Sequence, residues 1–160
     1  MIKGTNSSIF LLMIFMFLLN SGCRNNVIYT DSTIITAGTW KTDNVVEFRP
    51  VISDTATIQN IFFTIRTGSS YPFRNIWLFV NTISPSGKSI TDTLQYMLAD
   101  EKGKWYGRGL GDLKELNLPF RSGVWFPEKG AYQFKIRHGM RTVDLKGVYD
   151  IGLRIEKAKK

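Results

Sequence analysis

The chain has 160 residues, of which 43% are hydrophobic and 21% are charged, and its formal net charge at pH 7 is +8. A single cysteine and a single histidine exclude a disulfide framework and a zinc site built from cysteine and histidine within this chain. The length suits one domain with a sizeable core, and no repeat or Gly/Ser linker divides it.

The N-terminal segment has the order of a lipoprotein signal peptide. Lys3 is followed by the eleven-residue apolar run 9–19, then by small residues and Cys23. About 20 apolar residues are needed to span a bilayer, so this run predicts a signal peptide over 1–22 rather than a membrane helix. We expect lipidation at Cys23, with acyl chains such as palmitate. The alternative is a plain secretory signal cut elsewhere, because Asn20 stands where a lipobox usually has leucine.

Lipidation has consequences for compartment and chemistry. Two or more acyl chains anchor a protein stably to a membrane. The protein would then lie outside the cytoplasm, where nucleic acid is not an expected partner. The thiol of Cys23 would be consumed by the lipid and could serve neither a metal nor catalysis. The basic excess, with a small cluster at Lys157, Lys159 and Lys160, would suit anionic headgroups, an acidic partner or a polyanionic glycan, or be merely a basic surface.

The remaining chain has the pattern of an antiparallel β protein. We expect residues 23–33 to be the lipidated N-terminus and a short polar tether, and 34–160 to be a β-sandwich domain. One of the expected strands, Val27–Tyr29, lies within the tether. The expected strands are Val27–Tyr29, Ile34–Thr36, Val45–Pro50, Ile58–Arg66, Ile76–Ile83, Ile90–Leu98, Trp105–Gly107, Ala131–Arg137, Val143–Leu145 and Ile151–Glu156.

These short strands and frequent turns predict an all-β, jelly-roll-like sandwich, with a small closed barrel as second choice. The alternation of Tyr132, Phe134 and Ile136 predicts one buried sheet face. The continuous apolar run 76–80 suggests a strand covered on both faces, and residues 84–87 suggest a hairpin turn. Only 112–116 looks helical, for about one turn.

No constellation of catalytic residues is evident, and no cofactor or metal is expected. His138 is alone and fits a loop or interface position. Scattered acids leave a carboxylate pair or a calcium site open at Asp92, Asp100, Glu101 and Asp112. Gly107, Gly109 and Gly111 are not followed by the helix that a phosphate cradle needs, so they predict tight backbone geometry instead.

Large aromatic residues next to turns are the stronger functional signal. We expect Tyr71, Trp105, Tyr106 and Trp125 to be candidate contacts for a protein partner or a glycan, with Trp105 the most exposed. The alternative is that these residues close the ends of the sandwich.

An ordered set of segments runs through the whole chain after Cys23. It includes residues 71–79 (YPFRNIWLF), 85–87 (PSG), Asp92-Thr93, 98–105 (LADEKGKW), 109–112 (GLGD), Pro127, 130–132 (GAY), 139–141 (GMR) and 147–157 (GVYDIGLRIEK). In this order, the chain resembles the GldH gliding-motility lipoproteins of the Bacteroidota.

The resemblance implies an envelope lipoprotein required for gliding motility, associated with type IX secretion and without enzymatic activity. Only the lipidated Cys23 transfers as a functional residue. Surface-exposed lipoproteins of that phylum tend to have acidic residues after the cysteine, whereas this chain has Arg24, Asn25 and Asn26. We therefore expect a periplasm-facing domain anchored to the outer membrane.

Three functions follow as hypotheses. The first is a non-catalytic scaffold or assembly component that binds other envelope proteins of the gliding and secretion machinery. The second is a lipid-anchored glycan-binding module, for which a sandwich fold is only an analogy. The third, and weakest, is a glycan hydrolase that uses two of the four acids named above.

Overall fold

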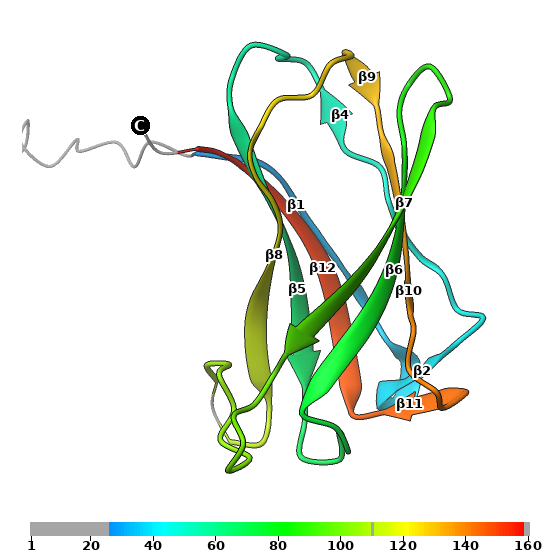
Figure 1. The fold of residues 1–160 in the computed structure, drawn as a ribbon, viewed down its shortest axis with the longest axis vertical. Helices are drawn as coiled ribbons and strands as arrows, with labels where there is room; N and C mark the ends of the chain where they lie inside the picture. Colours follow the sequence, from blue (N-terminus) through cyan, green and yellow to red (C-terminus); the bar gives the residue numbers. More distant parts are fainter. Residues whose placement is uncertain (1–25, 110, 159–160) are drawn as a thin grey trace, which may run out of the picture.

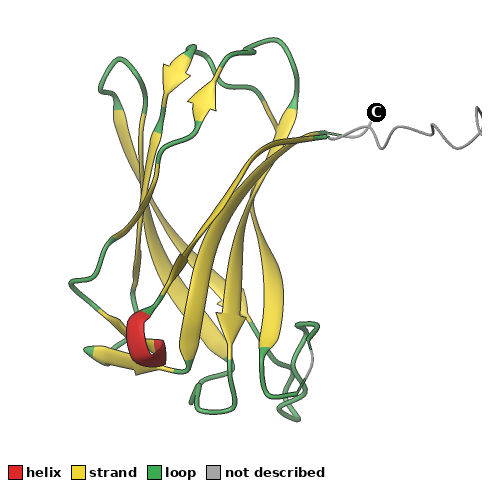
Figure 2. Cartoon of the chain, turned by 180° about the vertical axis from the view of Figure 1, so that it is seen from behind, coloured by secondary structure: helices red, strands yellow, loops and turns green. Residues whose placement is uncertain are grey.

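The structure is a computed structural model that describes residues 26–109 and 111–158. The predicted signal peptide and Cys23 lie outside the described residues. Two four-stranded antiparallel sheets face each other, with strand orders β1-β12-β5-β8 and β3-β10-β6-β7 (Figures 1 and 2). Their strands are β1 (Val27–Ile34), β3 (Val46–Phe48), β5 (Gln59–Thr67), β6 (Asn75–Ile83), β7 (Ser89–Met97), β8 (Lys114–Val124), β10 (Gln133–His138) and β12 (Val148–Lys157).

This connectivity is a jelly roll. Of these eight strands in chain order, the first, eighth, third and sixth form one sheet, and the second, seventh, fourth and fifth form the other. The predicted all-β sandwich is confirmed. The closed barrel is wrong, because the described residues pair neither β1 with β3 nor β7 with β8.

Smaller elements cover the two ends of the sandwich. A 3₁₀ turn (Thr36–Gly38) precedes β2 (Thr39–Lys41), which pairs with β11 (Asp144–Lys146) at one end. At the other end β4 (Val51–Ile52) pairs with β9 (Gly130–Ala131). Figure 1 shows these two ribbons at the bottom and the top of the molecule, respectively.

The core lies between the sheets and follows from residue alternation in the strands. In β10 and just before it, Tyr132, Phe134 and Ile136 are all buried, as the pattern predicts. Aromatic contacts link the layers: the ring of Phe120 on β8 lies 5.0 Å from that of Phe63 on β5 and 6.4 Å from that of Phe134 on β10.

Four expectations from the sequence are wrong. Residues 27–33 are not a tether, because β1 pairs along its length with β12. Residues 112–116 do not form a helical turn, because β8 begins at Lys114. The run 76–80 is not covered on both faces, since Trp77 on β6 is 37% exposed. Residues 105–107 make only an isolated bridge, between Ala99 and Trp105.

The predicted hairpin at 84–87 is confirmed. It joins β6 to β7, and the amide of Gly87 donates to the carbonyl of Ser84 at 2.9 Å. Gly87 has a φ of 87°, a conformation that glycine adopts without strain.

Candidate functional site

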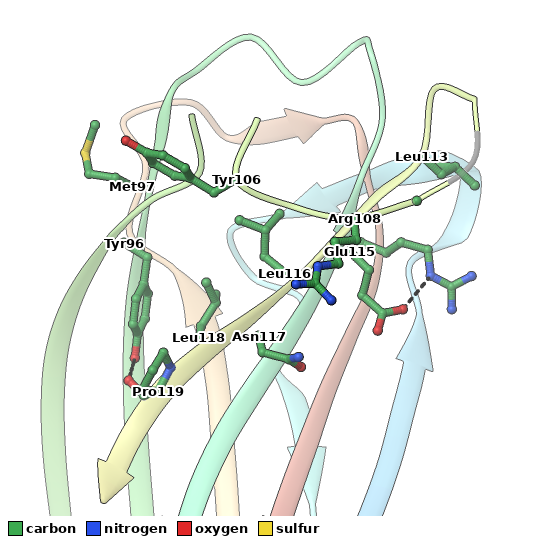
Figure 3. A pocket seen from close by; sticks show the side chains of 12 residues that line it. Tyr96, Met97, Tyr106, Arg108, Leu113, Glu115, Leu116, Asn117, Leu118 and Pro119 are labelled. Atoms are coloured by element: carbon green, nitrogen blue, oxygen red, sulfur yellow. Dashed lines mark hydrogen bonds and ion pairs between the residues drawn. The ribbon is translucent and has the colours of Figure 1, made fainter. Parts of the chain in front are cut away.

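A groove opens between the two sheets, where their edge strands β7 and β8 face each other. Its volume is about 1020 Å³. It extends toward the end of the sandwich that carries the long β7–β8 loop, residues 98–113 (Figure 3). The lining residues are Arg66, Tyr96, Met97, Tyr106, Arg108, Gly109, Leu113, Glu115, Leu116, Asn117, Leu118 and Pro119. We call this feature the edge groove.

The edge groove has an apolar floor and an apolar rim. Leu116 and Leu118 on β8 are buried and form part of the core. Around them Tyr106, Met97 and Leu113 are exposed by 61%, 47% and 39% of their surface. Exposed apolar residues scattered singly are ordinary, but three beside one hollow are characteristic of a binding surface.

The β7–β8 loop positions Tyr106 through its own backbone. The carboxylate of Asp100 accepts from the amides of Lys102 and Lys104 at 2.9 and 2.8 Å, which closes a tight turn. The amide of Tyr106 then donates to the carbonyl of Leu98 at 3.0 Å. These bonds hold Tyr106 beside the end of β7.

The glycine-spaced part of this loop needs small residues, as predicted. A Cβ on Gly107 would lie 2.8 Å from the side chain of Leu116, and one on Gly109 would meet the carbonyl of Leu113. Between them Arg108 forms a β-bridge with Glu115, with both backbone hydrogen bonds made. The loop thus packs directly against the start of β8.

The polar side chains of the edge groove carry an excess of positive charge. Arg66 lies 3.9 Å from the carboxylate of Glu115 and 3.8 Å from that of Asp150. Arg108 is exposed and has no ion pair among the described residues. The groove itself is therefore lined by two cations and one carboxylate.

Two contacts join the sheets along the groove edge. The hydroxyl of Tyr96 on β7 donates to the carbonyl of Pro119 on β8 at 2.8 Å, drawn as a dashed line in Figure 3. Burial raises the pKa of Tyr96 to about 12, so the hydroxyl remains a donor at neutral pH. Further along, Arg121 donates to Asp92 at 2.6 Å and its guanidinium lies 4.5 Å from the centre of the Phe120 ring.

The acids named from the sequence serve different local structures. Asp92 is held by Arg121 and Asp100 caps the loop turn, whereas Glu101 and Asp112 are exposed. No group of three or more potential metal-ligating side chains occurs in residues 26–109 and 111–158. Asp92 and Asp100 therefore stabilise the local structure, and the four acids do not come together in one metal site among the described residues.

The candidate aromatic contacts divide between core and surface. Tyr71 is buried, and its hydroxyl donates to the carbonyl of Asn75 at 2.8 Å. The ring of Trp105 is half-buried at 6.0 Å from that of Tyr71, so the expected high exposure of Trp105 is wrong. Tyr106 and Trp125 are exposed, but Trp125 follows β8 at the opposite end of that strand from the β7–β8 loop. The four residues therefore do not form one platform.

His138 is also placed differently from the expectation. It is 1% exposed within β10, and its ring lies 5.5 Å from that of Trp40 in an edge-on arrangement. Its Nε2 is 3.5 Å from the hydroxyl of Thr42. Burial lowers the pKa of His138, with partial opposition from hydrogen bonds to the backbone of Trp40 and Val143. His138 is a core residue, not a loop or interface residue.

Sequence reasoning missed the edge groove because it missed β8. The signal was present: Leu116, Leu118 and Phe120 alternate with Glu115, Asn117 and Pro119. Pro119 lacks an amide donor, but β8 pairs only with β5 among the described strands, so an edge strand accommodates it.

Comparisons with known proteins agree on one family. Residues 27–155 match the family model described as GldH lipoprotein. The chain is 34% identical to the gliding motility lipoprotein GldH homolog of Christiangramia forsetii, over 92% of this chain and 94% of that protein. It is 36% identical to the gliding motility lipoprotein GldH of Flavobacterium johnsoniae, over 73% of this chain and 77% of that one.

One solved structure is similar only weakly. A chain from the structure of the infectious bursal disease virus Gx strain aligns with a TM-score of 0.34 and 16% identity. The alignment covers 79% of the present chain and spans 29% of the viral one. In the part of the chain that the structure describes, no helix has both the length and the apolar character required to cross a bilayer.

Proposed function

The chain belongs to the GldH lipoprotein family, and from this premise we propose that it is a non-catalytic, lipid-anchored envelope component of gliding motility that binds a protein partner through the edge groove. The observation that carries the proposal is the apolar rim of Tyr106, Met97 and Leu113 around a floor of core leucines. A surface of this kind is suited to burial against another molecule.

The anchor in this proposal is a lipid on Cys23 in the outer membrane, with the domain facing the periplasm. Support comes from the sequence, in which Lys3, an apolar run of signal-peptide length and the lone cysteine follow in order. Arg24 after the cysteine favours the periplasmic side. Immunolabelling of intact and permeabilised cells tests this: signal without permeabilisation would place the domain on the cell surface instead.

The occupant that we propose for the edge groove is an extended, acidic segment of a protein of the gliding and type IX secretion machinery. Extended geometry is favoured because β7 and β8 each pair on one side only within residues 26–109 and 111–158, so their outer edges can accept a further strand. Acidic character is favoured because Arg108 lines the groove, is exposed and has no ion pair among the described residues, whereas Arg66 already lies beside Glu115 and Asp150.

Affinity purification of the full-length lipoprotein from mildly cross-linked native membranes tests the partner. We expect gliding or type IX secretion components with the lipidated protein and not with Cys23→Ala. Tyr106→Ala combined with Leu113→Ala should remove these components, and Arg108→Glu should weaken their recovery by charge repulsion. Val143→Ala is the matched control, because Val143 is 71% exposed and does not line the groove.

A glycan is the second candidate occupant, since Tyr96 and Tyr106 both line the edge groove and aromatic rings can stack on sugars. Binding to purified cell-wall fractions by the wild type, lost in Tyr106→Ala, would favour the glycan. Recovery of the same protein partners by the wild-type protein and by the Tyr106→Ala, Leu113→Ala variant would contradict docking in this groove.

A further inference from the structure

We propose that the end of the sandwich at which β1 begins is a membrane-contacting face that rests on anionic lipid headgroups, with Trp125 and Ile58 as its interfacial side chains. The inference rests on the lipid anchor of the proposed function and adds an orientation for the domain. We call this surface the anchor-side face. It is formed by residues 53–58, 84–88 and 124–129 together with Asn26 and Lys157.

One row of backbone pairs connects Asn26, directly before β1, to Val124, directly before Trp125. The amide of Lys157 donates to the carbonyl of Asn26 at 2.8 Å. Lys157 pairs with Gln59, and Gln59 pairs with Val124, the residue before Trp125. Neighbouring strands are about 4.8 Å apart, so this row places Val124 roughly 14 Å from Asn26. In Figure 1 the start of β1 and the end of β12 lie side by side near this end.

Ile58 belongs to the same row. Its carbonyl accepts from the amide of Ala158 at 2.8 Å, beside the Asn26–Lys157 bond. Its side chain is 50% exposed although the residue directly precedes a central strand. Trp125 is 65% exposed, and no aromatic contact of its ring occurs among the described residues. Tryptophan is enriched at the membrane–water interface, where its amphipathic ring lies at the level of the headgroups.

The loops of the anchor-side face are held to one another. The carboxylate of Glu128 accepts from the amide and the hydroxyl of Ser86 at 2.9 and 2.8 Å, which joins the β6–β7 hairpin to the β8–β9 loop. The side chain of Pro85 also lies against Gly130, the first residue of β9. These bonds make the hairpin and the loop with Trp125 one surface.

The charge of this surface matches an anionic bilayer. Lys88, Lys129 and Lys157 are exposed on it. Among the nearby carboxylates, Glu156 is paired with Arg154, whereas Glu128 and Asp54 accept hydrogen bonds from neutral groups and keep their negative charge. The three lysines thus exceed the two unpaired carboxylates of this face. Three further cations are close in sequence to residues of this face. Arg24 comes two residues before Asn26, and Lys159 and Lys160 come two and three residues after Lys157. Each lysine or arginine near an anionic surface contributes about 1 kcal/mol of attraction.

The short segment between Cys23 and Asn26 limits how far the domain can move from the lipid. Cys23 is three residues from Asn26, which spans at most about 11 Å when fully extended. A headgroup layer is itself roughly 5–7 Å deep, as the difference between whole and hydrocarbon bilayer thickness gives. A domain joined so closely must keep this end near the headgroups, while the loop at the far end of β7 and β8 points away.

The test uses the full-length lipidated protein in vesicles of phosphatidylethanolamine and phosphatidylglycerol, with brominated acyl chains. Cys23 is consumed by the lipid, so Trp125→Cys introduces the one thiol available to an environment-sensitive fluorophore. Tyr106→Cys is the matched control, because Tyr106 is 61% exposed against 65% for Trp125 but lies in the β7–β8 loop. Circular dichroism checks that each labelled protein is folded.

We expect a blue-shifted emission and strong quenching by brominated lipid at position 125, and neither at position 106. Equal quenching at both positions, or quenching at 106 alone, would overturn the orientation while leaving the anchor intact. Flotation with the vesicles is measured in parallel on unlabelled protein. A protein that does not float lacks the anchor, and that result would overturn both the proposed anchoring and this inference.

A second measurement needs no label. Lys88→Glu combined with Lys129→Glu should reduce quenching of the intrinsic fluorescence of Trp125 by brominated lipid, taken as the difference from Trp125→Phe. The same pair of changes in neutral phosphatidylcholine vesicles should have no effect. An unchanged signal in anionic vesicles would contradict the electrostatic part of the inference.

Discussion

The hydroxyl of Tyr96 and the carbonyl of Pro119 form a hydrogen bond of 2.8 Å between strands that belong to different sheets. No backbone ladder closes the sandwich between β7 and β8, so this side-chain bond and the Asp92–Arg121 pair are the polar links across that edge among the described residues. Tyr96 and Pro119 both line the edge groove, and the backbone of Pro119 can provide only an acceptor because its nitrogen carries no hydrogen.

Tyr96→Phe should lower the free energy of unfolding by about 1 kcal/mol, the usual net value of one hydrogen bond. The ring stays in place, so the loss reports the hydroxyl alone. Chemical denaturation measures it, with Tyr106→Phe as the control because that residue is exposed. Equal midpoints for both variants would show that the bond between the sheets contributes nothing.

Gly147→Ala should destabilise the fold far more than Gly87→Ala, although both glycines have left-handed φ angles of 78° and 87°. At Gly87 nothing lies near an added Cβ, so only conformational strain of about 1–2 kcal/mol applies. At Gly147 the added carbon would also collide with the backbone of Tyr71, and the loss should reach about 3 kcal/mol or more. Thermal unfolding of the pair measures the difference, and similar melting temperatures would contradict it.

Phe134→Ala should cost about 3–5 kcal/mol, because the ring is fully buried between the sheets and leaves a cavity when removed. Trp125→Ala removes a larger aromatic ring from the surface and should change stability by no more than about 0.5 kcal/mol. Urea unfolding of both variants provides the comparison. A small loss for Phe134→Ala would mean that the two sheets can close around the vacated space.

Stability should fall as the pH drops below about 6.5, because burial lowers the pKa of His138. Below this pH the unfolded chain binds a proton that the folded chain binds only at lower pH, so protonation favours unfolding. His138→Gln should flatten the pH dependence of the unfolding free energy below about pH 6.5, whatever its effect on stability at neutral pH. The lowered pKa values of Asp54 and Glu128 act at lower pH, below the ordinary range of those acids.

The sequence allowed the fold class to be predicted because alternation of buried and exposed residues is a local signal. It identified the face formed by Tyr132, Phe134 and Ile136, and the hairpin at 84–87. It failed at β8, where Leu113 and Leu116 have helical spacing and Pro119 argues against a strand. Pairing with β5 decided the outcome there, and such a partner is not visible in a local window.

The site was less predictable for the same reason. Arg66, Tyr96 and Leu116 come from three strands, and only the register between those strands brings them to one groove. The sequence identified the aromatic residues next to turns but not which of them are buried. Tyr71 lies in the core, and the ring of Trp105 packs against it. Tyr106, one position further along, remained exposed.

The pairing of β1 with β12 also determines how the domain would carry a mechanical load. β1 runs away from the N-terminus, along the ladder from Val27 to Ile34. A pull between a membrane lipid and a partner bound at the far end would act parallel to that ladder. Ladder hydrogen bonds lie across the strands, so such a pull shears them together, whereas a sideways pull would peel them one after another. Under the proposed anchoring, we therefore expect this ladder to resist tension along β1 better than a sideways pull.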